Sequence, residues 1–447
     1  MFSTDDTIAA IATPPGRGGI GVVRISGARA VEIASTLTAG RRLVPRHATL
    51  AAMTTCDGIQ IDHAVVTWFA APHSYTGEDV VEVSAHGSPI VLQQIVASAI
   101  DAGARLANPG EFTLRAYLNG RLDLVQAEAV GDLIDAVTPV QARVAFDALE
   151  GTLTARIGVV DAGLMDLIAK LEASLDFPDE GYHFVEPGRA ADAIDVAIGG
   201  IDAVLSDARR GRLIREGLTI AIVGRPNAGK STLFNRLVGA ERSIVTDVPG
   251  TTRDLLAERI DLDGIPVTVV DTAGLRTEAS DAIEEEGIAR ARSAAGIADA
   301  VIVVLDLSTP LGRDDEALIA STASRARIIA ATKADLRAAW EPERLGALPV
   351  SALTDRGLDD LRIAIVKALD IEPSRDRAAI SNVRHVDLMN RAQLALRAAR
   401  DAAATGAPEE FVLADLHEAR GAFDEIVGTR TTDDVLQRIF ERFCVGK

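Results

Sequence analysis

The chain has 447 residues, too many for one ordinary hydrophobic core, so we expect two or three domains. Hydrophobic residues make up 48% and charged residues 25%, a composition that excludes an intrinsically disordered chain. The net charge is −19, whereas proteins that bind nucleic acid without a partner usually have more basic than acidic residues. Any role on RNA therefore needs a local basic patch or the surface of a partner.

No part of the sequence predicts a membrane or secretory segment. The longest apolar runs, such as residues 300–305, have the length of a strand, and residues 1–6 lack the basic and apolar regions of a signal peptide. Cys56 and Cys444 are far apart and lack metal-ligand spacing, so we expect neither a disulfide nor zinc. These features favour a cytoplasmic protein with no membrane partner.

The N-terminal part, residues 1–121, mixes strands and helices. Apolar runs at 20–25 and 80–83 predict strands, and the pattern at 89–100 predicts an amphipathic helix. We expect an α+β domain here.

Residues 122–216 and 374–447 have apolar residues at three- and four-residue spacing, which predicts a discontinuous helical domain. Between them, residues 217–373 alternate short apolar runs with helix-like sequence. Such alternation is typical of a mostly parallel sheet covered on both faces. The runs expected to be strands are residues 218–223, 267–270, 301–306 and 328–332. The predicted fold is thus multidomain α/β plus all-α, with the α/β domain inserted in the helical domain.

A phosphate-binding loop follows the first of these strands. Gly224-Arg225-Pro226-Asn227-Ala228-Gly229-Lys230-Ser231 fits the pattern GxxxxGK[ST] between a strand and a helix. Its amides and the helix N-terminus suit phosphate, Lys230 suits the β- and γ-oxygens, and Ser231 suits Mg²⁺. The predicted nucleotide-binding residues here are Asn227, Ala228, Gly229, Lys230, Ser231 and Thr232, with Lys230 also assigned a catalytic role.

Two later segments resemble the switch motifs of GTPases. Asp271-Thr272-Ala273-Gly274 ends a predicted strand and resembles the DxxG motif, in which Asp271 holds Mg²⁺ through water and the Gly274 N–H contacts the γ-phosphate. Upstream, Thr251-Thr252-Arg253-Asp254 can supply a threonine to the metal. All of Thr246, Thr251, Thr252, Asp271, Thr272, Ala273 and Gly274 are expected to bind GTP.

The base-recognition motif is Thr332-Lys333-Ala334-Asp335, at the end of another predicted strand. Asp335 is suited to accept hydrogen bonds from guanine N1–H and the 2-amino group, and a buried carboxylate left unpaired by adenine would be costly. Thr332 stands where the usual motif has Asn. Ser351-Ala352-Leu353 resembles the last GTPase motif, so GTP is predicted over ATP.

Leu275 stands where Ras-like enzymes place a water-orienting glutamine, so hydrolysis needs another device. Asn227 with the loop at 246–251 resembles the potassium site of cation-activated GTPases. The predicted K⁺ ligands are Asn227, Thr246, Val248 and Thr251. The alternative is that Asn227 only braces its own loop.

Motifs outside the α/β region identify the family. These are Asp6 to Gly19 (DTIAAIATPPGRGG), Tyr75 to Glu82 (YTGEDVVE), Pro109 to Thr113 (PGEFT), Leu122 to Ala129 (LDLVQAEA) and the terminal Phe443 to Lys447 (FCVGK). Together they resemble the MnmE (TrmE) family over essentially the full length. The resemblance implies a Ras-like GTPase domain, a folate-binding-like N-terminal domain and a homodimer.

The resemblance also assigns individual residues. It implies a tetrahydrofolate derivative bound by Arg24, Glu82, Arg121 and Lys447, Mg²⁺ bound by Ser231 and Thr252, and a water-orienting Glu284. Three consecutive glutamates at 284–286 also suit a solvated helix start. The resemblance makes Cys444 the candidate catalytic thiol near the folate carbon, with an inert helical cysteine as the alternative.

The implied reaction places a carboxymethylaminomethyl-type group on C5 of the wobble uridine (U34) of tRNA. It would use a heterotetramer with the FAD protein MnmG (GidA), which would carry FAD and NADH and most of the tRNA surface. A regulatory or ribosome-assembly GTPase without modification chemistry is the alternative function, and an ATPase is a third.

Overall fold

The computed structural model describes residues 5–176, 187–240, 256–262, 264–271, 298–369 and 380–447. Contacts divide the chain into two compact units: unit 1 is Met1–Gly131, Phe146–Ile201 and Asp387–Lys447, and unit 2 is Asp132–Ala145 and Asp202–Val386. The division between 1–121, 122–216 with 374–447, and 217–373 remains a prediction.

Unit 1 contains a six-stranded sheet with the order β3-β4-β5-β2-β1-β6. Its strands are β1 (Ile8–Ile11), β2 (Gly18–Ser26), β3 (Thr49–Thr54), β4 (Gln60–Phe69), β5 (Val80–Gly87) and β6 (Arg105–Leu106). Helices α1 (Ala30–Leu37) and α2 (Pro89–Asp101) bury Ile33, Leu37 and Ile95 against one face of this sheet. The strands predicted at 20–25 and 80–83 and the helix at 89–100 are confirmed.

The other face of the sheet meets α3 (Glu111–Leu118) and the C-terminal residues. Phe112 packs on Ile8 and Ala10 of β1, and the Phe112 N–H donates to the Lys447 carbonyl at 3.0 Å. Helix α15 (Asp433–Phe440) supplies Leu436 and Phe440 to a small core with Leu114. The last residues of the chain are therefore anchored beside α3.

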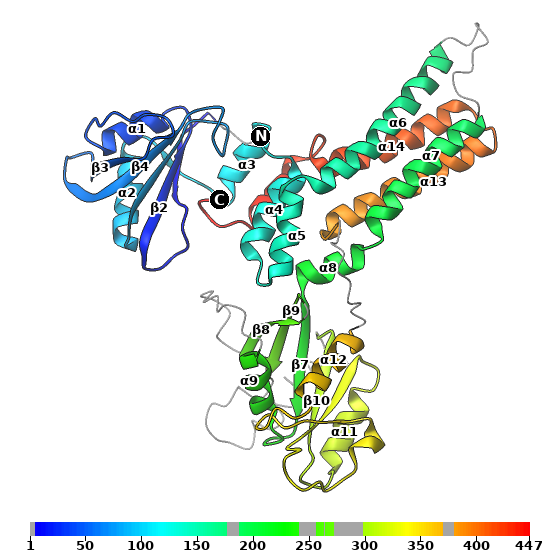
Figure 1. Ribbon diagram of the computed structural model, residues 1–447. Helices are drawn as coiled ribbons and strands as arrows, with labels where there is room; N and C mark the ends of the chain where they lie inside the picture. Colours follow the sequence, from blue (N-terminus) through cyan, green and yellow to red (C-terminus); the bar gives the residue numbers. More distant parts are fainter. Residues whose placement is uncertain (1–4, 177–186, 241–255, 263, 272–297, 370–379) are drawn as a thin grey trace. The chain divides into compact units, whose positions relative to one another are not determined.

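The remaining helices of unit 1 confirm the helical prediction. They are α4 (Leu124–Asp135), α5 (Pro139–Leu149), α6 (Thr152–Asp176), α7 (Pro187–Leu205), α13 (Val383–Ala404) and α14 (Glu409–Val427), some of which continue into unit 2. Helices α6, α7, α13 and α14 run side by side in Figure 1. Arg420 of α14 pairs with Asp161 of α6 at 2.8 Å, and Arg400 of α13 pairs with Asp195 of α7 at 3.3 Å.

Unit 2 is built on a second six-stranded sheet with the order β12-β11-β10-β7-β9-β8. Its strands are β7 (Leu218–Gly224), β8 (Leu256–Leu262), β9 (Ile265–Asp271), β10 (Ala300–Asp306), β11 (Arg327–Thr332) and β12 (Leu348–Pro349). Neighbouring strands are parallel except for the antiparallel pair β8 and β9. The predicted, mostly parallel sheet is confirmed.

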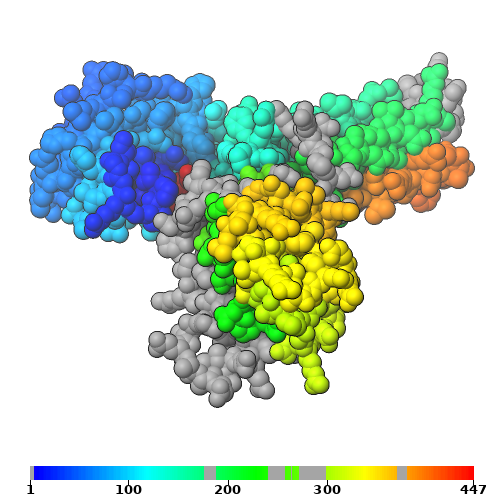
Figure 2. Space-filling view, turned by 60° about the horizontal axis from the view of Figure 1, so that its bottom comes forward, coloured from blue at the N-terminus to red at the C-terminus, as the bar shows by residue number. Residues whose placement is uncertain are grey.

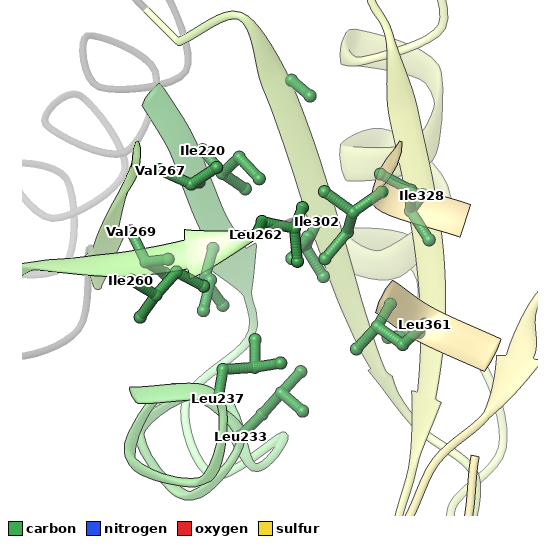
Figure 3. Close-up of a cluster of buried hydrophobic side chains, with 14 of the residues drawn as sticks. Ile220, Leu233, Leu237, Ile260, Leu262, Val267, Val269, Ile302, Ile328 and Leu361 are labelled. Carbon is green, nitrogen blue, oxygen red and sulfur yellow. The ribbon is translucent and has the colours of Figure 1, made fainter. Parts of the chain in front are cut away.

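Helices cover both faces of this sheet. On one face, α9 (Lys230–Ala240) and α12 (Leu358–Ala368) bury Leu233, Leu237 and Leu361 against the strands, as Figure 3 shows. On the other face, α11 (Arg313–Ser321) and the short 3-10 helix η2 (Pro342–Leu345) pack on a second apolar layer. Figure 2 shows the yellow residues, which follow residue 300 in the sequence, as one continuous surface.

Part of the region predicted to be purely helical packs with the α/β unit. The Thr138 hydroxyl donates to the Gly264 carbonyl in the β8–β9 turn at 2.9 Å, and Gln141 donates to the Arg215 carbonyl of α8 (Ala208–Glu216) at 3.1 Å. The start of α5 is thus joined to the hairpin between the two predicted switch segments. Among the described helices, none has the length and apolarity that a bilayer crossing requires.

Candidate functional site

The predicted phosphate loop joins β7 to α9. Asn227 and Gly229 have positive φ values of 60° and 93°, which curl the backbone at the carboxyl end of β7. Helix α9 begins at Lys230, so the loop lies at a helix N-terminus, where backbone N–H groups have no acceptor within the helix. The nearly buried Lys230 Nζ donates to the carbonyls of Gly224 at 2.9 Å and Arg225 at 2.7 Å. The ammonium is therefore held at the mouth of the loop.

Thr332 connects the base-recognition segment to the phosphate loop. Its buried hydroxyl lies 2.5 Å from the Ala228 carbonyl and 3.1 Å from the Leu305 carbonyl. A threonine has one hydroxyl proton, which these two acceptors share. Thr332 therefore links the end of β11 to the phosphate loop and to β10, although it replaces the usual Asn.

Lys333 has a positive φ of 59° and pairs with Asp306 at the end of β10, with Nζ 2.5 Å from Oδ2. The other Asp306 oxygen accepts from the Ser308 N–H and hydroxyl at 2.9 and 2.6 Å. Burial raises the pKa of Asp306, but the bonds from Lys333 and Ser308 outweigh it and hold that pKa below its ordinary value. Asp306 thereby fixes the direction of the lysine stem.

Asp335, the predicted guanine ligand, is exposed and anchored at its base. The buried Ser351 hydroxyl donates to Asp335 Oδ1 at 2.6 Å. The Ser351 N–H donates to the Arg356 carbonyl, and Leu353 is 78% exposed at the tip of this turn. Asp335, Ser351, Ala352 and Leu353 are thus close together, and among the described residues Oδ2 of Asp335 has no hydrogen-bond partner.

Other predicted nucleotide residues are only partly described. Ser231 and Thr232 are exposed in the first turn of α9. Asp271 ends β9, where it pairs in register with Ile222 of β7. Thr246, Val248, Thr251, Thr252, Thr272, Ala273, Gly274, Leu275 and Glu284 lie outside the described residues.

The predicted folate residues Arg24 and Glu82 meet on the sheet face away from α1 and α2. They are opposite each other in the β2–β5 register, with Arg24 Nη2 2.8 Å and Nε 3.0 Å from Glu82 Oε1. The guanidinium carbon lies 5.1 Å from the Tyr75 ring centre and 5.6 Å from that of Phe112. Burial raises the pKa of Tyr75, whose hydroxyl bonds to Thr113 at 2.8 Å.

The C-terminal turn brings Lys447 to this neighbourhood through its backbone bond to Phe112. Gly446 has a φ of +97°, and a Cβ there would lie 2.1 Å from the Ile11 carbonyl oxygen, so only glycine fits. Cys444 is exposed, and its carbonyl accepts from the Gly110 N–H at 3.3 Å. Arg121 is exposed beside Gly77, and among the described residues it forms no hydrogen bond or ion pair with Glu82.

An ion network surrounds the buried Arg115 of α3. Arg115 is fully buried and pairs with Glu111 at 2.9 Å, Asp6 at 2.6 Å and Glu78 at 3.2 Å, while Arg105 pairs with Glu111 at 2.6 Å. Burial raises the pKa of Glu111, but hydrogen bonds from Arg105, the Asn108 N–H and Arg115 hold it below 4.5. The network ties α3 to the start of β1.

Two family models match the chain. One described as the MnmE helical domain matches residues 124–444, more than half of the chain, and one described as the GTP-binding protein TrmE N-terminus matches residues 7–121. The chain belongs to the MnmE family.

Relatives in the MnmE family match over the full length. The tRNA modification GTPase MnmE of Koribacter versatilis (strain Ellin345) is 44% identical over 455 residues, with 100% of both chains covered. That of Azoarcus sp. (strain BH72) is 45% identical, covering 99% of this chain and 98% of the relative. A solved structure of an Aquifex aeolicus Era variant bound to GDP and AlF4− covers 40% of this chain and 66% of that one at 24% identity. Its TM-score is 0.28, too low to add to the assignment.

The predicted family, the fold class and the assignment as a tRNA modification GTPase are therefore confirmed. The individual site residues within the MnmE-type architecture remain predictions, although the geometry brings several of them together.

Three ion pairs around the predicted nucleotide site were not anticipated from the sequence. Asp306 orients Lys333, and its only signal was a carboxylate at the end of a predicted strand. Arg236 of α9 pairs with Asp355 after Ser351-Ala352-Leu353. Asp315 pairs with Arg225, but within the acidic run 314–316 nothing marks the buried member.

Proposed function

We propose that this chain binds GTP on the loop between β7 and α9 and hydrolyses it during wobble-uridine modification of tRNA. One observation carries the proposal. Thr332 bonds to Ala228 of the phosphate loop, and three residues later Asp335 is held by Ser351. The groups suited to the base and those suited to the phosphates therefore belong to one hydrogen-bonded frame.

In this frame the Lys230 ammonium leaves the two loop carbonyls that it now contacts and binds the β- and γ-phosphate oxygens, whose charge it neutralises. The Ser231 hydroxyl is exposed at the helix start, a position that fits a Mg²⁺ ligand, with Thr252 as the second ligand and Asp271 acting through water. When bound, Mg²⁺ neutralises charge between the phosphates. Thr232, Thr272, Ala273 and Gly274 complete the proposed nucleotide contacts.

A K⁺ ion bound by Asn227, Thr246, Val248 and Thr251 is part of the proposal. Asn227 is exposed at a positive φ, and within the described residues its amide has no hydrogen-bond partner. That observation does not support the alternative of an asparagine that braces its own loop. When bound, K⁺ supplies positive charge where an arginine finger would act.

We propose that unit 1 holds a tetrahydrofolate derivative, which supplies the one-carbon unit. The Arg24–Glu82 pair offers a guanidinium and a carboxylate beside the rings of Tyr75 and Phe112, a set that fits a flat heterocycle with amide and amino groups. Both bonds from Arg24 go to Oε1 of Glu82, so in the described part of the chain Oε2 remains without a hydrogen-bond partner. Lys447 and Arg121 suit the glutamate tail, and Cys444 is the proposed thiol.

The remaining partners are proposed from family membership. They are a second copy of this chain and the FAD protein MnmG (GidA), with tRNA held mainly by the complex, in the cytoplasm. The chain has 65 acidic against 46 basic residues, and an acidic protein by itself repels the phosphates of tRNA. This balance supports a partner that supplies most of the tRNA-binding surface.

The test measures nucleotide affinity and GTP hydrolysis in equal concentrations of KCl and NaCl. Wild type should bind GTP and turn over faster in KCl. Asp335→Asn should weaken GTP binding by about 100-fold and improve binding of xanthosine triphosphate, because an amide donates where the carboxylate accepts. Glu343→Gln, an exposed acid of η2, is the matched control. Unchanged GTP affinity in Asp335→Asn would overturn the proposed site.

A further inference from the structure

A buried carboxylate on α11 is directed at the phosphate loop. Asp315 lies in the first turn of the helix and is 1% exposed. Its Oδ2 accepts from the Gly312 N–H at 2.9 Å and lies 2.7 Å from Nη2 of Arg225. Within the described residues its Oδ1 is buried without a hydrogen-bond partner. Arg225 is therefore the one cation that compensates this carboxylate in the described part of the chain.

Helix capping alone does not account for this arrangement. Asp314 and Glu316 flank Asp315 in the same turn and are exposed, so they interact with the helix dipole at little desolvation cost. A capping side chain needs only an acceptor oxygen for the Gly312 N–H. Burying a full charge costs several kcal/mol unless an opposite charge lies beside it. The burial of Asp315 is thus explained by the pairing with Arg225.

Arg225 in turn is connected to Lys230. The Arg225 carbonyl accepts from Lys230 Nζ at 2.7 Å and from the Ala228 N–H at 3.3 Å. An anchor on the Arg225 side chain therefore restrains the carbonyl that orients the ammonium. Thr332 restrains the other side of the same loop through the Ala228 carbonyl.

We infer that Asp315 is a positioning residue, which through Arg225 holds the phosphate loop in its nucleotide-binding shape. The inference rests on the proposed nucleotide site. Because the loop is shaped before the ligand arrives, less conformational freedom is lost on binding. GDP and GTP should benefit equally, since the restraint acts on the loop rather than on the γ-phosphate.

The test is a double-mutant cycle on nucleotide affinity with Asp315→Asn and Arg225→Gln. Asparagine keeps an oxygen for the Gly312 N–H, so the helix cap survives while the charge is lost. Isothermal titration with GDP and a non-hydrolysable GTP analogue should show about tenfold weaker binding for each single variant. The double variant should be no weaker than the worse single variant. Asp314→Asn, the matched exposed control, should bind as wild type.

Four results separate the explanations. Asp315→Asn with a lower melting temperature but wild-type affinity would show a purely structural role, and additive losses in the double variant would also overturn the inference. If one of the two variants fails to fold, the other alone decides: a loss below about twofold in its affinity would overturn the inference, whereas a larger loss supports it. Lys230→Ala tests the underlying site: if it binds as wild type, the proposed function fails whatever Asp315 does.

Discussion

The Thr332 hydroxyl lies 2.5 Å from the Ala228 carbonyl and so joins the end of β11 to the phosphate loop. The usual asparagine is absent, but a threonine at the carboxyl end of a buried strand reaches the same loop. We therefore expect this hydroxyl to contribute to the affinity for both GDP and GTP.

Replacing Thr332 by valine keeps the shape and removes this hydrogen bond. We expect GDP and GTP affinity to fall by about fivefold, because two buried carbonyls lose a shared donor. Titration calorimetry measures the effect. Thr332→Ser, which retains the hydroxyl, is the control, and equal affinities for the two variants would contradict the bridge.

Glu284→Ala is expected to preserve GTP binding and to slow turnover by about tenfold or more, because a group that orients the attacking water acts only on the chemical step. Steady-state hydrolysis with saturating GTP measures it. Glu286→Ala, two residues away in the same acidic run, should turn over normally. Equal rates for both variants would remove Glu284 from the mechanism.

Gly446→Ala is expected to displace the C-terminal turn, since the new Cβ would lie 2.1 Å from the Ile11 carbonyl oxygen at a φ of +97°. Lys447 would lose its place beside Phe112, so tetrahydrofolate affinity should fall by about tenfold while GTP affinity is unchanged. Gly406→Ala is the control, because its φ is +67° and nothing lies within 4 Å of the added carbon. Wild-type folate binding by Gly446→Ala would count against a role for the C-terminus.

The ion network around Arg115 makes the stability of unit 1 sensitive to acid. The pKa values of Glu111 and Asp6 lie below their ordinary 4.5 and 3.8 in the folded chain. Hydrogen bonding from Arg105 is the largest cause for Asp6, and for Glu111 the bonds from Arg105, Asn108 and Arg115 outweigh burial. Groups with lowered pKa values stabilise the fold above their unfolded values, and this stability is lost as pH falls through the folded values.

We therefore expect these two carboxyl groups to leave the melting temperature of unit 1 unchanged above about pH 5. Below about pH 4.5 their protonation should lower it. Trp68 reports on unit 1 when the other tryptophan is removed by Trp340→Phe. Glu111→Gln should cost about 3 kcal/mol at pH 7, since Arg115 loses a buried partner, and should flatten the acid dependence. If the melting temperature of Glu111→Gln falls with pH as that of the wild type does, other carboxylates cause the acid sensitivity.

Several parts of the fold and the site were predictable because the signal is local. The GxxxxGK[ST] loop, the strand runs of unit 2 and the helix at 89–100 are contiguous, and each pattern expresses a backbone geometry that neighbouring residues impose. Family motifs at both ends of the chain also indicated MnmE-type chemistry without any knowledge of the packing.

Tertiary structure decided which distant side chains meet. Arg24 and Glu82 are 58 residues apart and become partners only through the register of β2 and β5. Likewise, Asp315 rather than Asp314 reaches Arg225, because the packing of α11 on the sheet buries one carboxylate and leaves its neighbour in water. Sequence alone specifies residue types and local periodicity, whereas burial and pairing depend on contacts between elements that no local pattern encodes.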